Sequence, residues 1–185
     1  MNNFNFMKKI IAGFIITINI GTLFFVSPLS QNLSDLGNAL GHRMYLILWA
    51  TTSSLYFGVY TRNLMKCSCY NKKIGIFLLY LSCFGMIFSV FLPYAPYQYP
   101  NLSKWHTRIA MGSTITFVLL FYHYIYDLMY KDYVTFMKIM KLYTSLVVFD
   151  LLLYLLNGGV STLLEISFTI GLVLLLPYAQ SLFKK

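Results

Sequence analysis

Two polar segments of an otherwise apolar chain hold most of the side chains that could do chemistry. Residues 32–43 read NLSDLGNALGHR and residues 101–108 read NLSKWHTR. Together they contain two of the three histidines and two of the three arginines, and each leads into a long apolar stretch. An imidazole can act as a general base, bind a metal or donate a hydrogen bond to a phosphate. We therefore expect any chemistry of this chain at these two segments.

Within the two segments, Asp35 and His106 are the candidate catalytic pair, acting as acid and base. Ser34 with Asp35 and His106 could also be assembled into a hydrolase site. The sequence has no nucleophile elbow, phosphate-binding loop, zinc-protease motif or dinucleotide fingerprint to support one reaction. The candidate binding residues of the two segments are Ser34, Asp35, His42, Arg43, His106 and Arg108.

Two further acidic residues, Asp150 and Glu165, fall inside predicted apolar spans. Asp150 lies seven residues before Asn157, which is roughly 10 Å along a helix. An ionisable group at membrane depth is costly and is expected to have a partner. One hypothesis is a structural ion pair with Arg43 or Arg108. The other is a site that handles a ligand or a proton, and both acids then join the candidate binding residues.

The elements that must position these groups are membrane helices. The chain has 185 residues, of which 58% are hydrophobic and 10% are charged, whereas a soluble domain has about 25% charged residues. Several apolar stretches approach the roughly 20 residues needed to cross a bilayer. The sequence therefore predicts an all-α, polytopic membrane helix bundle that forms a single domain over residues 1–185. Its six predicted spans are approximately 10–29, 44–60, 74–92, 109–126, 142–156 and 162–182.

The fifth predicted span is the shortest, and Gly158 and Gly159 follow it in a predicted tight turn. Merging the last two spans would give a five-helix protein. Lys184 and Lys185 at the end of the chain favour six spans, because with five they would lie on the side that has few basic residues.

The distribution of basic residues predicts the orientation. Counting lysine and arginine, eleven lie at the two ends and in the 61–73 and 127–141 connections, against three (Arg43, Lys104 and Arg108) on the opposite side. By the positive-inside rule both termini are cytoplasmic and both polar segments are outside. The net charge of +9 is thus a topology signal, and a nucleic-acid partner is not supported.

The sequence also predicts local structure around the segments. Ser34 and Ser103 could be N-caps, so that helices begin near Asp35 and Lys104. The stretch Pro93–Pro100 contains three prolines that hold it extended. Its tyrosines and the nearby tryptophan suit the headgroup layer or, alternatively, a wall facing a ligand; they are Tyr94, Tyr97, Tyr99 and Trp105.

No metal and no cofactor are expected. His123 lies alone toward the cytoplasmic end of its span, so it supplies neither the second axial ligand of a haem nor the third histidine of a zinc site. Cys67 and Cys69 fall in a predicted cytoplasmic loop and should stay reduced, while Cys83 lies inside a span.

Ser34-Asp35-Leu36-Gly37 and the run from His106 to Ala110 resemble the damage-regulated autophagy modulator (DRAM) family and its GPI-anchor remodelling relatives. The resemblance covers roughly residues 10–126 and carries over to Ser34, Asp35, Gly37 and His106. It implies six helices, cytoplasmic termini and motifs in the first two outer loops. In the animal members a proline-containing run follows the acidic residue, and this run is missing after Asp35. The chain is thus more similar to the uncharacterised bacterial branch, which implies a bacterial plasma-membrane protein without an assigned reaction.

Three functions remain open. In the first, the outer cluster binds a lipid headgroup or a membrane-protein partner, with Arg43, Lys104 and Arg108 facing phosphate. In the second, the protein is a lipid-modifying enzyme that uses Asp35 and His106, oriented by Asp150 or Glu165. In the third, Asp150 and Glu165 serve a small proton-coupled transporter, although broken helices and a clear inverted repeat are missing from the sequence. Whether the protein is an enzyme stays undecided at this stage.

Overall fold

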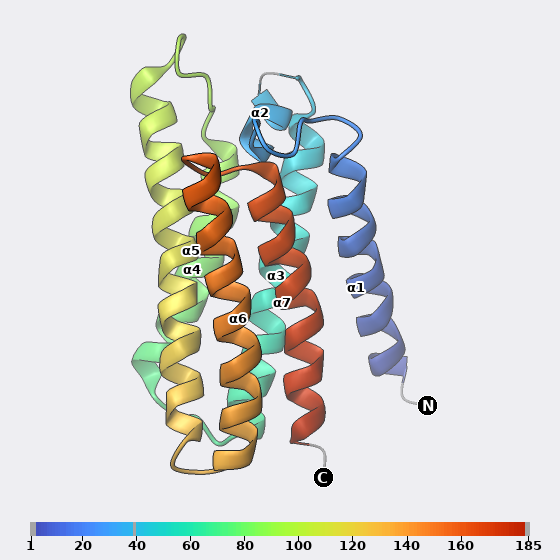
Figure 1. Cartoon of the computed structure of the whole chain (residues 1–185), viewed down its shortest axis with the longest axis vertical. Coiled ribbons are helices and arrows are strands. Elements are labelled where there is room, and N and C mark those ends of the chain that lie inside the picture. The colour runs from blue at the N-terminus through green and yellow to red at the C-terminus, as the bar shows by residue number, and fades with distance from the viewer. Residues whose placement is uncertain (1–2, 39, 184–185) are drawn as a thin grey trace.

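The computed structural model describes residues 3–38 and 40–183, with side chains from Lys9 onward. Lys184, Lys185 and the side chain of Lys8, which entered the charge comparison, lie outside this part. The described residues form seven helices (Figure 1): α1 (Asn3–Thr22), α2 (Leu33–Asn38), α3 (Arg43–Cys67), α4 (Lys73–Phe91), α5 (Pro100–Leu128), α6 (Tyr133–Asn157) and α7 (Thr162–Leu182).

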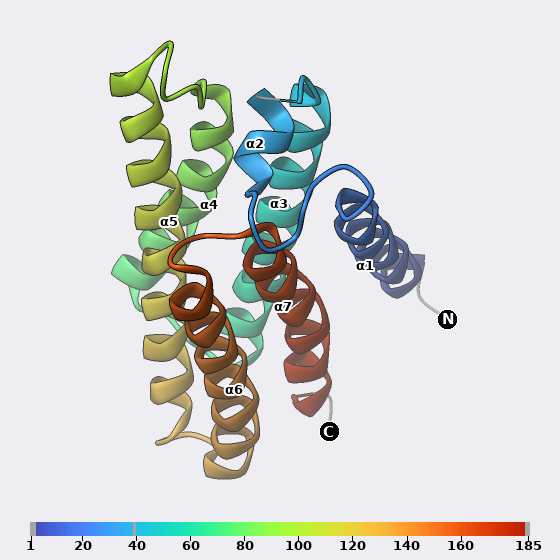
Figure 2. The ribbon, with the colours of Figure 1, turned by 45° about the horizontal axis from the view of Figure 1, so that its top comes forward.

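Five long helices form a closed ring in which α3, α4, α5, α6 and α7 each contact the next, and α7 contacts α3. Helix α1 packs outside the ring against α3 and α7. Successive long helices run in opposite directions, as short connections require. We call the end where α1 begins and α7 ends the terminal end, and the opposite end the far end (Figures 1 and 2). The short helix α2 lies at the far end.

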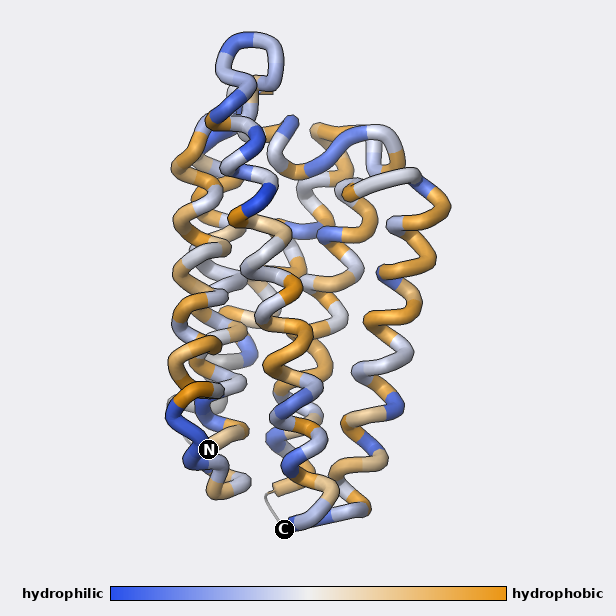
Figure 3. The backbone as a smooth tube through the Cα atoms, turned by 90° about the vertical axis from the view of Figure 1, so that its left-hand side faces the viewer, coloured by the Kyte–Doolittle hydropathy of each residue, from blue (hydrophilic) through white to orange (hydrophobic). Residues whose placement is uncertain are grey.

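Four helices, α4 to α7, are long and apolar enough to cross a membrane. Apolar positions predominate along the middle of the bundle (Figure 3), and many large apolar side chains on its outer surface are exposed, among them Leu55, Phe84, Leu119 and Leu174. A soluble protein rarely exposes apolar surface on this scale. The all-helical architecture and the apolar exterior are consistent with the predicted membrane protein.

Helix α3 is not among these four helices because it contains more polar residues. Several of these polar residues are buried. Ser53, Ser54 and Thr61 are all nearly fully buried, as are Tyr56 and Tyr60. Because α3 contacts α1, α2, α4 and α7, much of its surface packs against other helices, and polar side chains are buried there. The lower hydropathy of α3 is therefore explained by its many contacts with neighbouring helices.

The core fills the terminal half of the ring. Its largest members are aromatic, and Phe121 packs against Phe117, Tyr124 and Tyr143 with ring centroids 4.7–6.1 Å apart. A second, smaller apolar cluster lies at the far end and includes Leu33 and Leu36 of α2. The site described below borders both clusters.

The structure corrects the predicted start of the helices at the far end. Ser34 is not an N-cap: Asn32 is, because its side chain accepts a hydrogen bond from the backbone N–H of Asp35 at 3.0 Å. The Asp35 carboxylate in turn accepts from the N–H of Asn32 at 3.0 Å, which is the reciprocal arrangement of a capping box. Helix α2 is separate from α3, and Gly41 between them has a φ of +78°.

Ser103 is not an N-cap either. Helix α5 begins at Pro100, a residue whose fixed φ and missing N–H suit the first helical turn. Ser103 lies inside the helix, where its hydroxyl accepts a hydrogen bond from the N–H of Ala95 at 2.9 Å. This contact fastens the preceding loop to α5.

The five-helix alternative is wrong, because α6 and α7 are separate helices. Helix α6 ends at Asn157, and its C-cap Gly158 takes a left-handed φ of +66°, as the sequence predicted. Ser161 then caps α7 by accepting from the N–H of Leu164 at 3.4 Å. Residues 3–38 and 40–183 thus form six long helices and the short α2.

Candidate functional site

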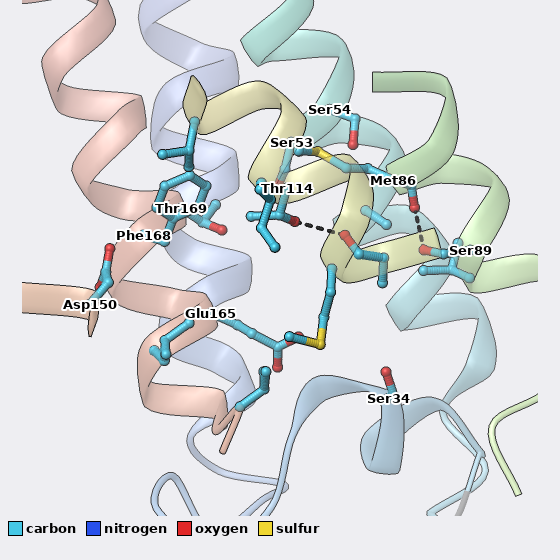
Figure 4. A pocket seen from close by; sticks show the side chains of 18 of the residues that line it. Ser34, Ser53, Ser54, Met86, Ser89, Thr114, Asp150, Glu165, Phe168 and Thr169 are labelled. Carbon is cyan, nitrogen blue, oxygen red and sulfur yellow. Dashed lines mark hydrogen bonds between the residues drawn. The ribbon is translucent and has the colours of Figure 1, made fainter. Parts of the chain in front are cut away.

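A cavity of about 330 Å³ occupies the far half of the ring. Residues of α3, α4, α5, α6 and α7 line it, and α2 contributes Ser34. Four of the predicted site residues meet here: Ser34, His106, Asp150 and Glu165. Figure 4 shows three of these side chains together with polar residues of α3 and α5 around the same space.

Glu165 and the start of α7 hold α2 over this cavity. The Glu165 carboxylate accepts a hydrogen bond from the N–H of Leu33 at 2.7 Å. The N–H of Thr162 donates to the carbonyl of Gln31 at 2.7 Å, and the N–H of Leu163 donates to that of Pro28 at 2.9 Å. A carboxylate at the N-terminus of a helix satisfies backbone N–H groups that have no partner within the helix. These contacts hold α2 and the loop before it against the start of α7, and so they position Ser34 at the cavity.

Ser34 and His106, far apart in the sequence, form a hydrogen bond of 2.8 Å between Oγ and Nε2. The other imidazole nitrogen of His106, Nδ1, lies 2.7 Å from the carbonyl oxygen of Ser89 and 3.2 Å from that of Leu92. Carbonyl oxygens only accept, so Nδ1 carries the proton and donates to them. In the neutral imidazole Nε2 is then the acceptor, and the Ser34 hydroxyl donates to it.

The two carbonyl groups belong to the end of α4, where the carbonyl of Ser89 also accepts from the N–H of Leu92 at 3.0 Å. His106 therefore caps α4 and is oriented by it. The imidazole is 3% exposed, and the ring of Tyr94 packs against it at a centroid distance of 5.3 Å. The arrangement gives a serine hydroxyl, a proton acceptor and a fixed tautomer, which are the parts of a nucleophile activated by a base.

Asp150 is the second polar feature of the cavity. One carboxylate oxygen accepts a hydrogen bond from the hydroxyl of Ser167. The other oxygen, Oδ2, is buried without a hydrogen-bond partner, and so is the hydroxyl of Ser53 on α3. Both residues line the cavity. Buried polar atoms are nearly always paired in native proteins, so two unpaired ones on residues that line one cavity are unusual.

Most of the remaining lining surface is apolar, although several hydroxyl groups and His106 also lie in it. The cavity wall includes Trp49, Phe57 and Phe168, and no lysine or arginine is among the described residues that line it. The two acidic side chains, Asp150 and Glu165, are the lining groups that could be charged in addition to His106. Such a lining suits an alkyl chain together with a neutral or cationic polar group that donates hydrogen bonds.

We infer that the cavity opens sideways between the far halves of α5 and α6, from the exposure of residues that line it. Met111 and Ile115 on α5 and Leu151 and Tyr154 on α6 all line it, yet each is 36–54% exposed on the outer surface of the bundle. In their terminal halves the same helices are closed, because the Tyr143 hydroxyl donates to the carbonyl of Val118 at 3.2 Å. An opening here faces the surroundings of the helices and not the far-end surface.

Four other predicted binding residues have different partners outside the cavity. Asp35 belongs to the capping box of α2. Arg43 donates to the carbonyl of Phe91 at 2.8 Å, and the guanidinium of Arg108 lies 5.7 Å from the centre of the Trp105 ring. The ring of His42 packs on Phe25 at 5.0 Å.

The predicted ion pair of Asp150 or Glu165 with an arginine is not formed. The ion pairs among the described residues both involve Asp127 at the terminal end, with Lys72 at 2.9 Å and Lys131 at 2.7 Å. The hydrogen bond to Asp127 raises the pKa of Lys72. Within the part of the chain that the structure describes, no three His, Cys, Asp or Glu side chains are placed to hold a metal.

Sequence reasoning missed Ser53, Ser167 and the carbonyl of Ser89. A run of Thr-Thr-Ser-Ser at 51–54 inside an apolar span was a signal for Ser53, because hydroxyl groups at membrane depth need partners. The Ser89 carbonyl carried no signal, since the sequence cannot show which backbone groups approach a side chain.

In comparisons with known proteins, the chain matches no family model, no curated protein and no solved structure. The conclusions about its function therefore come from the site itself.

Proposed function

We propose that this protein binds a single-chain membrane lipid in the far-half cavity. The alkyl chain enters between α5 and α6, past Ile115 and Leu151, and the polar part of the lipid lies against Asp150 and Ser53. The observation that carries this proposal is the pair of unpaired buried polar atoms, Asp150 Oδ2 and Ser53 Oγ, on residues that line a largely apolar cavity with exposed residues of α5 and α6 at its side.

The charge of the lining selects the class of lipid. A phosphate group would meet two acidic residues and no lysine or arginine, and like charges in an apolar cavity repel strongly. A hydroxyl or amine group can donate to Asp150 Oδ2, which removes the penalty of a buried acceptor without a partner. The ligand is thus a neutral or cationic amphiphile. This differs from the phosphate-binding role that Arg43, Lys104 and Arg108 would have.

The membrane topology is part of the proposal. We propose that all six long helices cross the membrane, α1 and α3 included, because they run beside the four apolar helices for a similar length. The terminal end carries the basic residues of the 61–73 and 127–141 connections, which supports a cytoplasmic location for both termini. The cavity then lies in the outer half of the membrane.

We also propose a relation to the DRAM-like six-span family, in its bacterial branch. The two motifs that carry the resemblance come together at the hydrogen bond between Ser34 and His106. That contact gives a physical reason for both motifs to occur in one chain. A transport path is less well supported, because the aromatic core fills the ring below the cavity.

Two adjacent leucines allow a matched test of lipid binding. Leu151 and Leu152 are 54% and 51% exposed, but of the two only Leu151 lines the cavity. In lipid nanodiscs, a photoactivatable monoacylglycerol should crosslink to the wild-type protein. Leu151→Trp should lower the crosslinking about tenfold by filling the opening, a loss of roughly 1.4 kcal/mol in binding. Leu152→Trp should leave it unchanged.

The crosslinked peptides should come from α5, α6 or α7 around the cavity. Asp150→Asn should also weaken crosslinking, because the amide can still accept from Ser167 but presents a donor to the cavity where the carboxylate presented an acceptor. Equal crosslinking of both tryptophan variants, or crosslinks confined to the outer surface, would contradict the proposal.

A further inference from the structure

We propose that Ser34 and His106 form a catalytic pair that cleaves the acyl ester of the bound lipid, with Ser34 as nucleophile and His106 as general base. The substrate class rests on the proposed function; the reactivity of Ser34 does not. The pair differs from the acid–base pair expected from the sequence, in which Asp35 took the place of Ser34.

Three contacts of His106 support this assignment. Its Nδ1 donates to the carbonyl groups of Ser89 and Leu92, so Nε2 is free to accept the proton of Ser34 across 2.8 Å. When that proton is transferred, the imidazole becomes positively charged at the C-terminus of α4. The carbonyl end of a helix stabilises a positive charge, so the helix that orients the base also favours its protonated form.

Ser34 is accessible to a substrate although its partner is buried. It lies on a six-residue helix, is half-buried and lines the cavity beside Glu165. A purely structural serine at this place would need only to hold α2 to α5. The contacts of Glu165 with Leu33 and of Thr162 with Gln31 already hold α2 in position. The Ser34–His106 hydrogen bond is thus one of several contacts that hold the helix, and not the sole one.

The reaction is balanced with water as the only co-reactant. Ser34 Oγ attacks the ester carbonyl carbon while His106 Nε2 takes the hydroxyl proton. The tetrahedral intermediate then breaks its bond to the alcohol oxygen, and Nε2–H protonates that oxygen, which leaves an acyl group on Ser34. Water attacks this acyl group with the same base, and Ser34 is regenerated as a fatty acid leaves.

The cavity restricts the substrate to an ester with one alkyl chain and hydroxyl or amine groups. The apolar wall accommodates the chain, and Asp150 Oδ2 and Ser53 Oγ are acceptors for the alcohol part. A monoacylglycerol has this chemistry, and a phosphate-bearing lipid does not. The lateral opening at Ile115 and Leu151 lets such a lipid enter from the membrane.

An alkyl fluorophosphonate tests the nucleophile directly, because it bonds covalently to activated serines. In nanodiscs containing the full chain, mass spectrometry should find the probe on Ser34. Ser34→Ala should abolish labelling at this position, and His106→Gln should slow it by about 100-fold, within the range that a general base contributes. Ser82→Ala is the matched control. This buried serine of α4 donates only to its own helix, at the carbonyl of Leu79, and labelling should be unchanged.

Hydrolysis of monooleoylglycerol by the same samples is the second measurement, and Ser34→Ala should abolish the release of oleate. If His106→Gln does not insert into membranes, the comparison of wild type with Ser34→Ala still shows whether Ser34 is the nucleophile. Lipid crosslinking without labelling of Ser34 overturns the catalytic pair and leaves lipid binding intact. Labelling of Ser34 without lipid crosslinking overturns the binding proposal and leaves the nucleophile.

Discussion

Asp35 and Ser34 are neighbours in the sequence, but the structure gives them different tasks. The backbone turn at the start of α2 directs Ser34 to His106 and Asp35 back to the N–H of Asn32. A helix of six residues exposes adjacent side chains on different faces, so only one of the two can reach the cavity. The sequence selected both neighbours as candidate site residues but could not decide which of them contacts His106.

Substitution of Asp35 tests whether this residue only caps helix α2 or also acts as a catalytic acid. Asp35→Asn keeps an oxygen that can accept from Asn32, so we expect stability within about 0.5 kcal/mol of the wild type and unchanged fluorophosphonate labelling. Asp35→Ala removes the acceptor and should lower the free energy of unfolding by about 1 kcal/mol. Thermal unfolding in detergent measures both variants. Loss of esterase activity in a stable Asp35→Asn protein would show instead that Asp35 takes part in the reaction.

Helix α2 is the element on which the site depends most. It is too short to be stable by itself, and its position comes from Glu165, the preceding loop and two buried leucines, Leu33 and Leu36. Gly37 allows it to approach α3, because a Cβ at that position would lie 3.0–3.3 Å from side-chain carbons of Leu46 and closer still to one of its methyl groups. The glycine therefore sets the distance between the two helices.

Gly37→Ala should displace α2 and disturb the site. We expect a loss of about 1–3 kcal/mol in stability from overpacking, together with slower labelling of Ser34. Gly112→Ala is the control: Gly112 lies in α5 with nothing within 4 Å of an added Cβ, so alanine should stabilise its helix by about 0.5–1 kcal/mol. Thermal unfolding and labelling rates measure both. Equal behaviour of the two variants would contradict the role given to Gly37.

The whole molecule has two ends of different character. At the terminal end, Lys131 connects two helix ends by binding both Asp127 and the carbonyl of Ser68. The terminal half of the helix ring is filled by aromatic side chains. The far half has no such filling and contains the cavity under α2. The terminal half is thus filled and the far half is hollow.

Cysteine labelling tests the proposed orientation. Cys67 and Cys69 are exposed near the terminal end, and Cys83 is buried. A membrane-impermeant maleimide should label the wild-type protein only after cells are permeabilised. A variant that lacks Cys67 and Cys69 and carries Tyr97→Cys, at a fully exposed far-end position, should be labelled in intact cells. Labelling of both positions from the same side would contradict the six crossings.

The sequence by itself determined the helical architecture and the separation of the last two helices. Apolar span length, charge placement and a glycine turn are local properties, and they predicted the long helices because hydrogen bonding along a helix is local as well. The sequence also selected Ser34, His106, Asp150 and Glu165, since polar groups in an apolar chain are few.

Only the tertiary structure decided which of these groups meet. Ser34 and His106 are 72 residues apart, and their contact depends on how Glu165 and Gly37 hold α2 over the ring. The unpaired oxygen of Asp150 and the sideways opening depend on how α5 and α6 diverge beside it. Such relations arise from packing between distant segments, and no periodicity or motif in the chain encodes them locally.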